Sequence, residues 1–258
     1  NRYPIAQHPA LGQVVRPLPL NGGPTADRDL LLTKAGLHQR PAPPRGSGKV
    51  PGARGRIDCT DQPALLLRSW TDSSAPGLPA VHVEARDGGC RLWLHAPAVA
   101  ERIIGSNALD LWLRERMEAL CLGENWQPLL QPSLNAITNF LPGEEAEAVT
   151  VRMDISQEGV LTDWEFSLST VKPAAFIGVA QLKALDERKP KSRSIPAALK
   201  GIKDHLGQLE TLRFCESCLR KNEQSQGFVQ LDLSPPQLES LADLRWADPI
   251  SLRHRWID

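Results

Sequence analysis

The sequence predicts an α+β fold in which a mixed or antiparallel sheet packs against helices. Two stretches, 80–95 and 149–171, alternate apolar and polar residues on both sides of a turn-forming segment, which is typical of β-hairpins. A third stretch, Ile195 to Lys221, repeats apolar residues at every third or fourth position, which indicates a helix with one buried face. We therefore expect a sheet built from the two hairpins to pack against this long helix.

Residues 1–55 differ from the rest of the chain because they are rich in proline, glycine and arginine. The segment from Pro41 to Gly48 has the densest run of residues that break regular structure. One short patch, Asp27 to Lys34, has a helical pattern. We expect residues 1–55 to form an N-terminal segment and linker, and residues 56–258 to hold the main folded region.

The first hairpin pairs Ala80–Glu84 with Arg91–His95 around a turn that contains two glycines. From Ala108 to Leu122, apolar residues then recur at helical spacing with charged residues between them. These apolar residues are Leu109, Trp112, Leu113, Met117 and Leu120. The pattern predicts a helix over residues 108–122.

The second hairpin pairs Val149–Ile155 with Val160–Val171. Beyond it, Ala174–Leu185 has a helical pattern, and a basic stretch separates it from the long helix. A strand-like segment, Phe228 to Leu233, follows the long helix. The side chains that we expect to be largely buried are Trp93, Leu94, Leu109, Leu113, Phe166, Leu206 and Leu209.

The charge of the chain is balanced, because 30 Lys and Arg residues stand against 30 Asp and Glu residues. Overall charge therefore gives no sign of nucleic-acid binding, which would need a local basic track. The five cysteines are an odd number in a chain too long to need disulfide support, which favours a reducing, cytoplasmic location. No apolar run is long enough to cross a membrane, and we expect no membrane partner.

Between residues 56 and 142 the chain carries four motifs in a fixed order. Asp72 is followed by Pro76-Gly77-Leu78-Pro79-Ala80, and then by Arg91-Leu92-Trp93-Leu94-His95-Ala96-Pro97-Ala98-Val99. Gly105-Ser106, Leu109-Asp110, Arg114 and Arg116 come next, and Pro128-Leu129-Leu130-Gln131-Pro132 comes last. In order and spacing these motifs resemble the catalytic domain of the ribonuclease II (RNB) family, including its cyanobacterial-type members. Members of the family read roughly R-L-W-V-H-I-A-D-V at the second motif and G-S-x-L-D at the third.

The resemblance covers about residues 56–235 and implies an RNB-type catalytic domain that is only partly present. Residues 56–258 would form the N-terminal half of this domain. The chain has no initiator methionine and stops at Asp258, before the second half of the family's domain. We therefore expect it to be a fragment of a longer reading frame.

The resemblance also implies a chemistry that this chain has lost. Active members degrade RNA from the 3′ end with magnesium ions held by a D-x-D-D-A cluster, because magnesium prefers carboxylate oxygens in near-octahedral geometry. The cluster positions read Pro76, Leu78 and Pro79 here, and Asp72 is the best candidate for a surviving acid, with a solvated loop aspartate as the alternative. Proline and leucine offer no side-chain oxygen, so we expect no intact catalytic residues, no bound metal and no other cofactor.

Two groups of basic residues are candidates for RNA contact. Arg114 and Arg116 match arginines of the family's G-S-x-L-D helix, where one supports the RNA channel, although an ion pair with Asp110 is an equal alternative for them. Apart from the resemblance, a dense positive patch could bind phosphates by counterion release, or could be a solvated loop and helix face. This patch includes Arg188, Lys189, Lys191, Arg193, Lys200 and Lys203.

Other residues of chemically active type are expected to be structural or solvated. They are Asp58, the acidic turn with Glu144, Glu145 and Glu147, the sheet histidine His95, and the pair Cys215 and Cys218. The two cysteines form a C-x-x-C pattern, but they lie within the predicted long helix with no second pair to complete a zinc site. The position that holds a stacking aromatic in the family's Y-L-P loop reads Cys121.

Three functions are consistent with the sequence. The first is a pseudo-ribonuclease that keeps the RNB fold and binds single-stranded RNA or a protein partner without cleaving. The second is an active magnesium-dependent 3′-to-5′ exoribonuclease that uses replacement acids. The third is an interaction scaffold with no RNA affinity, which the zero net charge and the lost stacking aromatic favour over tight RNA binding.

Overall fold

The computed structural model describes residues 13–14, 17, 23–34, 36–37, 43–44, 52, 54–68, 75, 77–116, 118–122, 125–130, 134, 138–189, 192 and 194–228. The helix α1 (Pro24–Lys34) belongs to one compact unit, and all other elements belong to a second. The predicted helical patch at Asp27–Lys34 is therefore correct, and α1 begins three residues earlier, at a proline whose fixed backbone angle suits a first helical turn.

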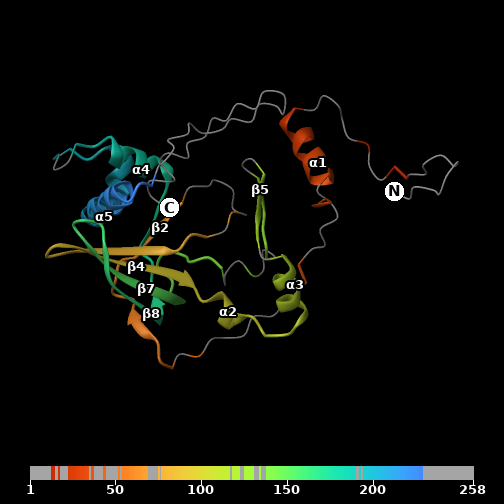
Figure 1. Ribbon diagram of the computed structural model, residues 1–258, viewed down its shortest axis with the longest axis horizontal. Helices are drawn as coiled ribbons and strands as arrows, with labels where there is room; N and C mark the ends of the chain where they lie inside the picture. The colour runs from red at the N-terminus through yellow and green to blue at the C-terminus, as the bar shows by residue number, and fades with distance from the viewer. Residues whose placement is uncertain are drawn as a thin grey trace. The chain divides into compact units, whose positions relative to one another are not determined.

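The second unit is built on a mixed sheet of seven strands (Figure 1). Their order across the sheet is β1-β8-β7-β4-β3-β2-β9. The strands are β1 (Ile57–Cys59), β2 (Leu65–Leu67), β3 (Ala80–Arg86), β4 (Gly89–Pro97), β7 (Ala146–Ser156), β8 (Leu161–Val171) and β9 (Ala175–Ile177). The α+β fold predicted from the sequence is confirmed.

Both predicted hairpins are present and form the centre of the sheet. β3 pairs with β4 around the turn at Asp87 and Gly88, and β7 pairs with β8 around a turn that ends at Gly159. Gly88 and Gly159 have positive φ angles of 83° and 76°, which residues with a side chain rarely adopt. Antiparallel pairing of β4 with β7 joins the two hairpins.

The short outer strands make the sheet mixed. β1 pairs in parallel with the end of β8, and β2 pairs in parallel with β9 while also pairing antiparallel with β3. The ends of the sheet are thus formed by segments from distant parts of the sequence. Arg56, just before β1, bonds to Ser169 of β8 across 113 positions.

One face of the sheet is covered by α4 (Val179–Asp186), η3 (Ala197–His205) and α5 (Leu206–Ser225), as Figure 1 shows for α4 and α5. The alternating residues Val81, Val83 and Leu92 point into this main core. Fully buried Leu199 and Leu209 meet them from the helices. The predicted helix at 195–221 is confirmed in position, although its first part is a 3₁₀ helix.

A second, smaller core lies on the opposite face of the sheet. It contains Ala80 of β3, Ala148 of β7, Val171 of β8 and Phe140, all buried. Successive residues of a strand point to opposite faces, so Ala80 belongs to this core while Val81 belongs to the main one. Residues 76–80, which the resemblance matches to the family's acid cluster, are called the degenerate stretch below. This stretch ends at Ala80, in the second core.

Two predicted helices have different bounds in the structure. The helix expected over 108–122 is α3 (Ala108–Arg116), and its last residues form β5 (Leu120–Leu122), which pairs with β6 (Asn125–Gln127). The helix expected over 174–185 begins as strand β9. α4 starts after Gly178, whose N–H donates to the side chain of Gln181, as in a helix cap. A short helix, α2 (Val99–Arg102), follows β4.

Most of the expected core residues are buried, with one clear error. Trp93, Leu109, Leu206 and Leu209 are buried, and Leu94 and Leu113 are half-buried. The expected burial of Phe166 is wrong, because 63% of this residue is exposed. It lies on the helix-covered face of the sheet, but on a strand beyond the reach of the helices. The strand expected at Phe228–Leu233 lies outside the described residues from position 229 onward.

None of the described helices combines enough length with enough apolar character to cross a bilayer.

Candidate functional site

The stretch that leads into β3 carries the four positions that the resemblance matches to the family's acids. Asp72 and Pro76 lie outside the described residues, whereas Leu78 and Pro79 are placed. Leu78 is half-buried and packs against the main core, and Pro79 is exposed. Neither side chain has an oxygen atom, so neither can be a side-chain ligand for a hard cation such as magnesium.

The same stretch packs closely against Asn139. A Cβ atom added to Gly77 would come 2.2 Å from Oδ1 of Asn139, which leaves no room for a side chain. That oxygen is buried and has no hydrogen-bond partner in the described part of the chain. The contact therefore fixes the course of the backbone just before Leu78.

His95 of β4 lies directly opposite Ala80 in the β3–β4 register. It is fully buried, and its Nδ1 is hydrogen-bonded to Oγ1 of Thr150 on β7, 2.8 Å away. Burial lowers the pKa of His95 to about 4, because the protein interior disfavours the charged imidazolium, and the nearby His82 lowers it further. His95 is thus neutral near pH 7, and the expectation of a buried sheet histidine is confirmed.

A line of buried polar groups continues from His95 across the sheet. Thr150 is hydrogen-bonded to Ser169 of β8, and the guanidinium of Arg56 donates to the carbonyl oxygens of Ser169 and Ala148. Arg56 also forms an ion pair with Glu101 of α2. The line ties β4, β7, β8 and α2 together beside the degenerate stretch. Glu101 is the one acid among its residues, so they do not form a cluster of metal-binding carboxylates.

The acidic residues singled out in the sequence either have other contacts or face solvent. Asp58 accepts hydrogen bonds from the N–H and hydroxyl of Thr60, which lower its pKa. Glu144 and Glu145 are exposed, and Glu147 forms an ion pair with Arg102. Among the residues that the structure places, no three His, Cys, Asp or Glu side chains are grouped as a metal site. The described residues therefore do not fit the magnesium centre that the resemblance would imply.

Arg114 and Arg116 lie in the last turn of α3. The guanidinium of Arg114 donates to Asp110 at 3.1 Å, as expected for residues four positions apart on a helix. Asp110 also accepts a hydrogen bond from the N–H of Ser106, the main cause of its lowered pKa. The guanidinium carbon of Arg116 lies 6.0 Å from the centre of the Trp112 ring. Arg114 remains exposed, so it can still approach an anion.

The second basic group lies between α4 and η3. Arg188 has a side chain only 11% exposed, and it donates to Glu210 at 2.5 Å and to the carbonyl oxygens of Ser192 and Ser194. Lys189 is exposed, and Lys191 and Arg193 lie outside the described residues. Arg188 thus ties the segment between α4 and η3 to α5 through its contact with Glu210. Of the neighbours Arg188 and Lys189, Lys189 is therefore the one that is accessible to an anion.

Cys215 and Cys218 lie in α5, within the helix predicted from the sequence, and both are buried. The thiol of Cys215 is hydrogen-bonded to Cys90 of β4, and this bond and burial both raise the pKa of Cys215. A raised pKa disfavours the reactive thiolate. These cysteines therefore contribute to packing between α5 and the sheet.

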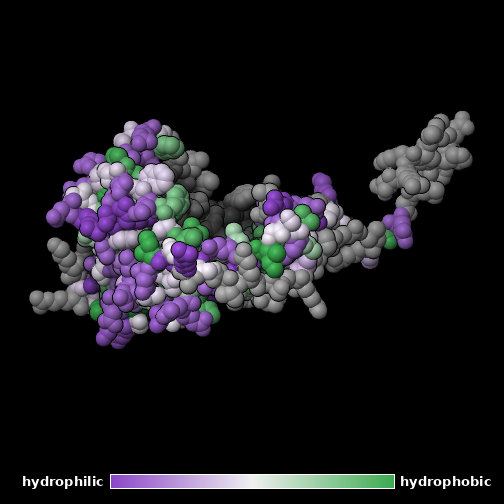
Figure 2. Space-filling model, turned by 90° about the horizontal axis from the view of Figure 1, so that it is seen from below, coloured by the Kyte–Doolittle hydropathy of each residue, from purple (hydrophilic) through white to green (hydrophobic). Residues whose placement is uncertain are grey.

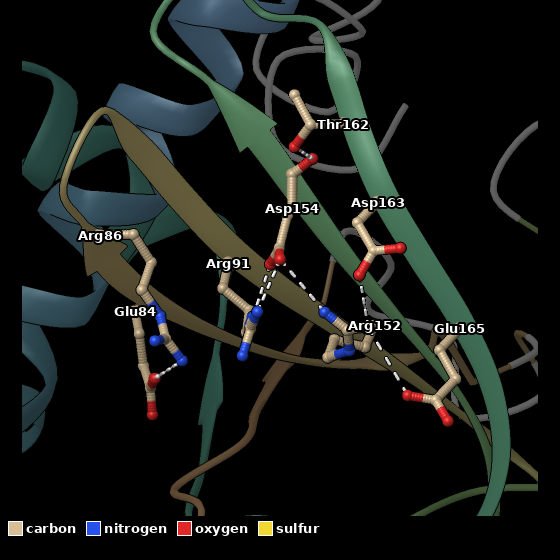
Figure 3. A network of polar contacts seen from close by, with 8 residues as sticks. All are labelled: Glu84, Arg86, Arg91, Arg152, Asp154, Thr162, Asp163 and Glu165. Atoms are coloured by element: carbon tan, nitrogen blue, oxygen red, sulfur yellow. Dashed lines mark hydrogen bonds and ion pairs between the residues drawn. The ribbon is translucent and has the colours of Figure 1, made fainter.

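One cluster of charged residues was missed by sequence reasoning. Arg91 of β4 donates two hydrogen bonds to Asp154 of β7, and Arg152 bridges Asp154 to Asp163 and Glu165 of β8 (Figure 3). The hydrogen bond from Arg91 is the main cause of the lowered pKa of Asp154. Strand register could have revealed the cluster, because Arg91 lies opposite Asp154 and Arg152 lies opposite Glu165.

The fold is similar to that of an RNase R and of a pseudonuclease. The structure superimposes on RNase R of Mycoplasma genitalium, solved with ribose-methylated single-stranded RNA, with a TM-score of 0.65 and 14% sequence identity. The match covers 84% of this chain and 34% of that enzyme. It also superimposes on yeast Ssd1, described as a pseudonuclease, with a TM-score of 0.58 and 18% identity over 76% of this chain and 24% of Ssd1.

Sequence comparison gives the same family. The acetazolamide conferring resistance protein zam of a Synechocystis strain is 27% identical over 190 residues, which are 66% of this chain and 23% of zam. The chain thus spans about a quarter to a third of the length of these relatives. The RNB domain profile matches residues 56–249, three quarters of the chain. The chain therefore belongs to the RNB domain family.

Proposed function

We propose that this chain is the first half of an RNB domain that binds single-stranded RNA without cleaving it. The observation that carries the proposal is the degenerate acid cluster, in which Leu78 and Pro79 stand where metal-holding acids would be needed. Leu78 is half-buried against the main core, so its side chain serves the fold. Hydrolysis by two metal ions needs carboxylates to position the metals and the attacking water.

Two further observations support this proposal. A pseudonuclease is among the proteins with a similar fold, and so is an RNase R that was solved with single-stranded RNA. Exposed Arg114 and Lys189 could each neutralise a phosphate. We propose that Lys191, Arg193 and Arg116 complete these two groups. Residues 1–55 would precede the domain as a separate segment, which agrees with a family match that starts at residue 56.

A protein-binding scaffold is the second candidate. Arg188 and Arg114 both contact carboxylates of the same chain, and the formal net charge is zero, which favours weak RNA binding at most. The buried thiols of Cys90 and Cys215 lie in contact without a disulfide. We accordingly propose a reducing compartment, such as the cytoplasm, as its place of action for either function.

One experiment separates these functions. Labelled oligouridylate is mixed with the chain at two salt concentrations, with and without magnesium, and both binding and chain length of the RNA are followed. A pseudonuclease binds with a salt-dependent affinity and leaves the RNA intact. A scaffold shows no binding at either salt concentration. Magnesium-dependent release of nucleotides would refute the proposal.

A further inference from the structure

Strand β8 has an open edge. Along one side it pairs with β7 over nearly its whole length, but on the other side β1 reaches only Ser169, Thr170 and Val171. Within the described strands, residues 161–168 therefore have a partner on one side only. Every second residue of such an edge directs its N–H and C=O outward, where an added strand could bond to them.

The open part of β8 also carries an apolar row. Trp164, Phe166 and Leu168 are 57%, 63% and 39% exposed, respectively. The rings of Trp164 and Phe166 meet edge to face with their centres 5.4 Å apart. Trp164 lies opposite Met153, which packs on the main core, so the row extends that face of the sheet beyond the helices. Contiguous exposed aromatic surface of this kind marks interaction sites.

The other face of the same edge is acidic. Asp163 and Glu165 have side chains 60% and 61% exposed and point to the side opposite the aromatic pair. Arg152 contacts both, but it also contacts Asp154, so its charge is shared. The network drawn in Figure 3 holds four carboxylates and three guanidinium groups, and the two most exposed carboxylates, those of Asp163 and Glu165, lie on the edge strand β8. The face of the molecule drawn in Figure 2 is mainly hydrophilic, with apolar residues between the hydrophilic ones.

We propose that the open edge of β8 binds an extended segment of a partner protein in which arginine or lysine alternates with apolar residues. In a strand added to β8, one set of side chains would extend the row of Trp164 and Phe166. The alternate set would lie beside Asp163 and Glu165, where cations are favoured. Backbone hydrogen bonds would supply affinity, and the two rows would select the sequence.

Two other occupants fit less well. A second copy of the chain, paired through its own β8, would bring Asp163 and Glu165 of one copy next to those of the other, and like charges that face each other destabilise a sheet. Single-stranded RNA would meet the same two carboxylates with its phosphates. The alternation of an acidic row with an aromatic row therefore favours a basic and apolar polypeptide strand.

The test uses the full 258-residue chain, labelled with ¹⁵N, and a synthetic ten-residue peptide in which valine alternates with arginine. We expect peptide addition to shift the amide signals of residues 161–168. A matched peptide with glutamate in place of arginine should bind at least about tenfold more weakly. A third peptide, N-methylated at alternate residues along its bonding edge, should not bind, because its backbone donors are removed.

A second test reverses the charge of acidic residues in the protein itself. The variant Asp163→Lys/Glu165→Lys should prefer the glutamate peptide, whereas the control Glu144→Lys/Glu145→Lys, altered at an exposed turn, should keep the original preference. Equal binding of the arginine and glutamate peptides to the unmodified chain would overturn the proposal, and so would binding of the N-methylated peptide. Self-association of the chain that protects the β8 amides would identify a second copy as the occupant and would also overturn it.

Discussion

Nδ1 of His95 lies 2.8 Å from Oγ1 of Thr150, and the protein encloses both side chains almost completely. The pair links β4 to β7 directly beside Ala80, at the end of the degenerate stretch. A histidine in this setting is neutral in the folded chain, because burial lowers its pKa to about 4 from an ordinary value of 6.5. This difference couples the stability of the domain to pH.

The first prediction is a loss of stability on acidification. Between pH 6.5 and about 4 the unfolded chain binds a proton at His95 that the folded chain does not bind, so the free energy of unfolding falls as the pH falls through this window. Protonation of His95 lowers the free energy of unfolding by about 3 kcal/mol over the whole window, and this loss is absent above pH 6.5. Urea unfolding at several pH values measures it.

The variant His95→Gln isolates this effect. It cannot take up the proton in either state, so its unfolding free energy should depend less on pH in this window than that of the unmodified chain. The control His205→Gln, at the start of α5, should keep the original slope. An unchanged slope in His95→Gln would show that His95 titrates alike in both states.

The second prediction concerns the two described positions of the former acid cluster. Leu78→Asp should lower the free energy of unfolding by about 1–3 kcal/mol, because it removes apolar contact with the main core and places a carboxylate there. Pro79→Asp, at an exposed neighbouring position, should change it by less than about 1 kcal/mol. Urea denaturation of both variants gives the comparison, and equal effects would contradict the packing of Leu78.

The third prediction is that magnesium or manganese does not stabilise the chain. A metal that binds only the folded state raises stability in proportion to RT ln(1 + [L]/Kd), so a thermal melt at increasing metal concentration reports any native site. We expect the same melting temperature with metal and with a chelator. A concentration-dependent rise that Asp72→Asn abolishes would reveal a retained site.

The fourth prediction separates the two basic neighbours between α4 and η3. Lys189→Ala should weaken binding of oligouridylate by a few-fold, because an exposed cation acts through contact with a phosphate. The slope of log K against log salt concentration should become shallower by about one. Arg188→Ala should instead lower the free energy of unfolding, since it removes contacts to Glu210 and to two carbonyl oxygens. Fluorescence anisotropy and urea unfolding measure the two quantities.

The exposed Lys172, between β8 and β9, provides the matched control for charge. Lys172→Ala removes the same charge as Lys189→Ala at another place on the surface. If both variants weaken RNA binding equally, the effect is one of net charge and no local basic track exists.

The central hairpins could be predicted because their information is local. Alternation of apolar residues and glycines at the turns both lie within a few positions of each strand. The same alternation assigned Phe166 to the correct face of the sheet, but it could not tell that the helices stop short of β8. Whether a face is covered depends on helices more than ten residues away in sequence and on the angle at which they cross the sheet.

The two misjudged helices have a related cause. Leu120 continues the helical spacing of α3, yet Leu120–Leu122 pairs with the strand that ends at Gln127. Ala175–Ile177 looks like the start of α4, but it pairs with β2, which comes more than a hundred positions earlier. Pairing with distant or later segments outweighs local preference in short apolar runs.

The resemblance to the RNB family suggested the chemistry of the candidate site, but nothing in the sequence indicated its geometry. That Pro76, Leu78 and Pro79 replace acids follows from the sequence match and stays a prediction. The contacts of Arg188 with Glu210, and of His95 with Thr150, join residues on different elements. They follow only from the register of the strands and the path of α5, so no spacing within one segment could indicate them.

The pairing of β1 with β8 has a consequence for how the domain is made. Ile57 lies opposite Ser169, so the first strand of the domain has no partner until the ribosome has released the whole of β8. Contacts between such distant segments slow folding, because the entropy of closing a long loop is lost before any bond forms. During synthesis, Arg56 and β1 therefore stay without their contacts to β8 until residues 169–171 have left the ribosome, so the sheet can close at this end only after about 115 further residues have been made.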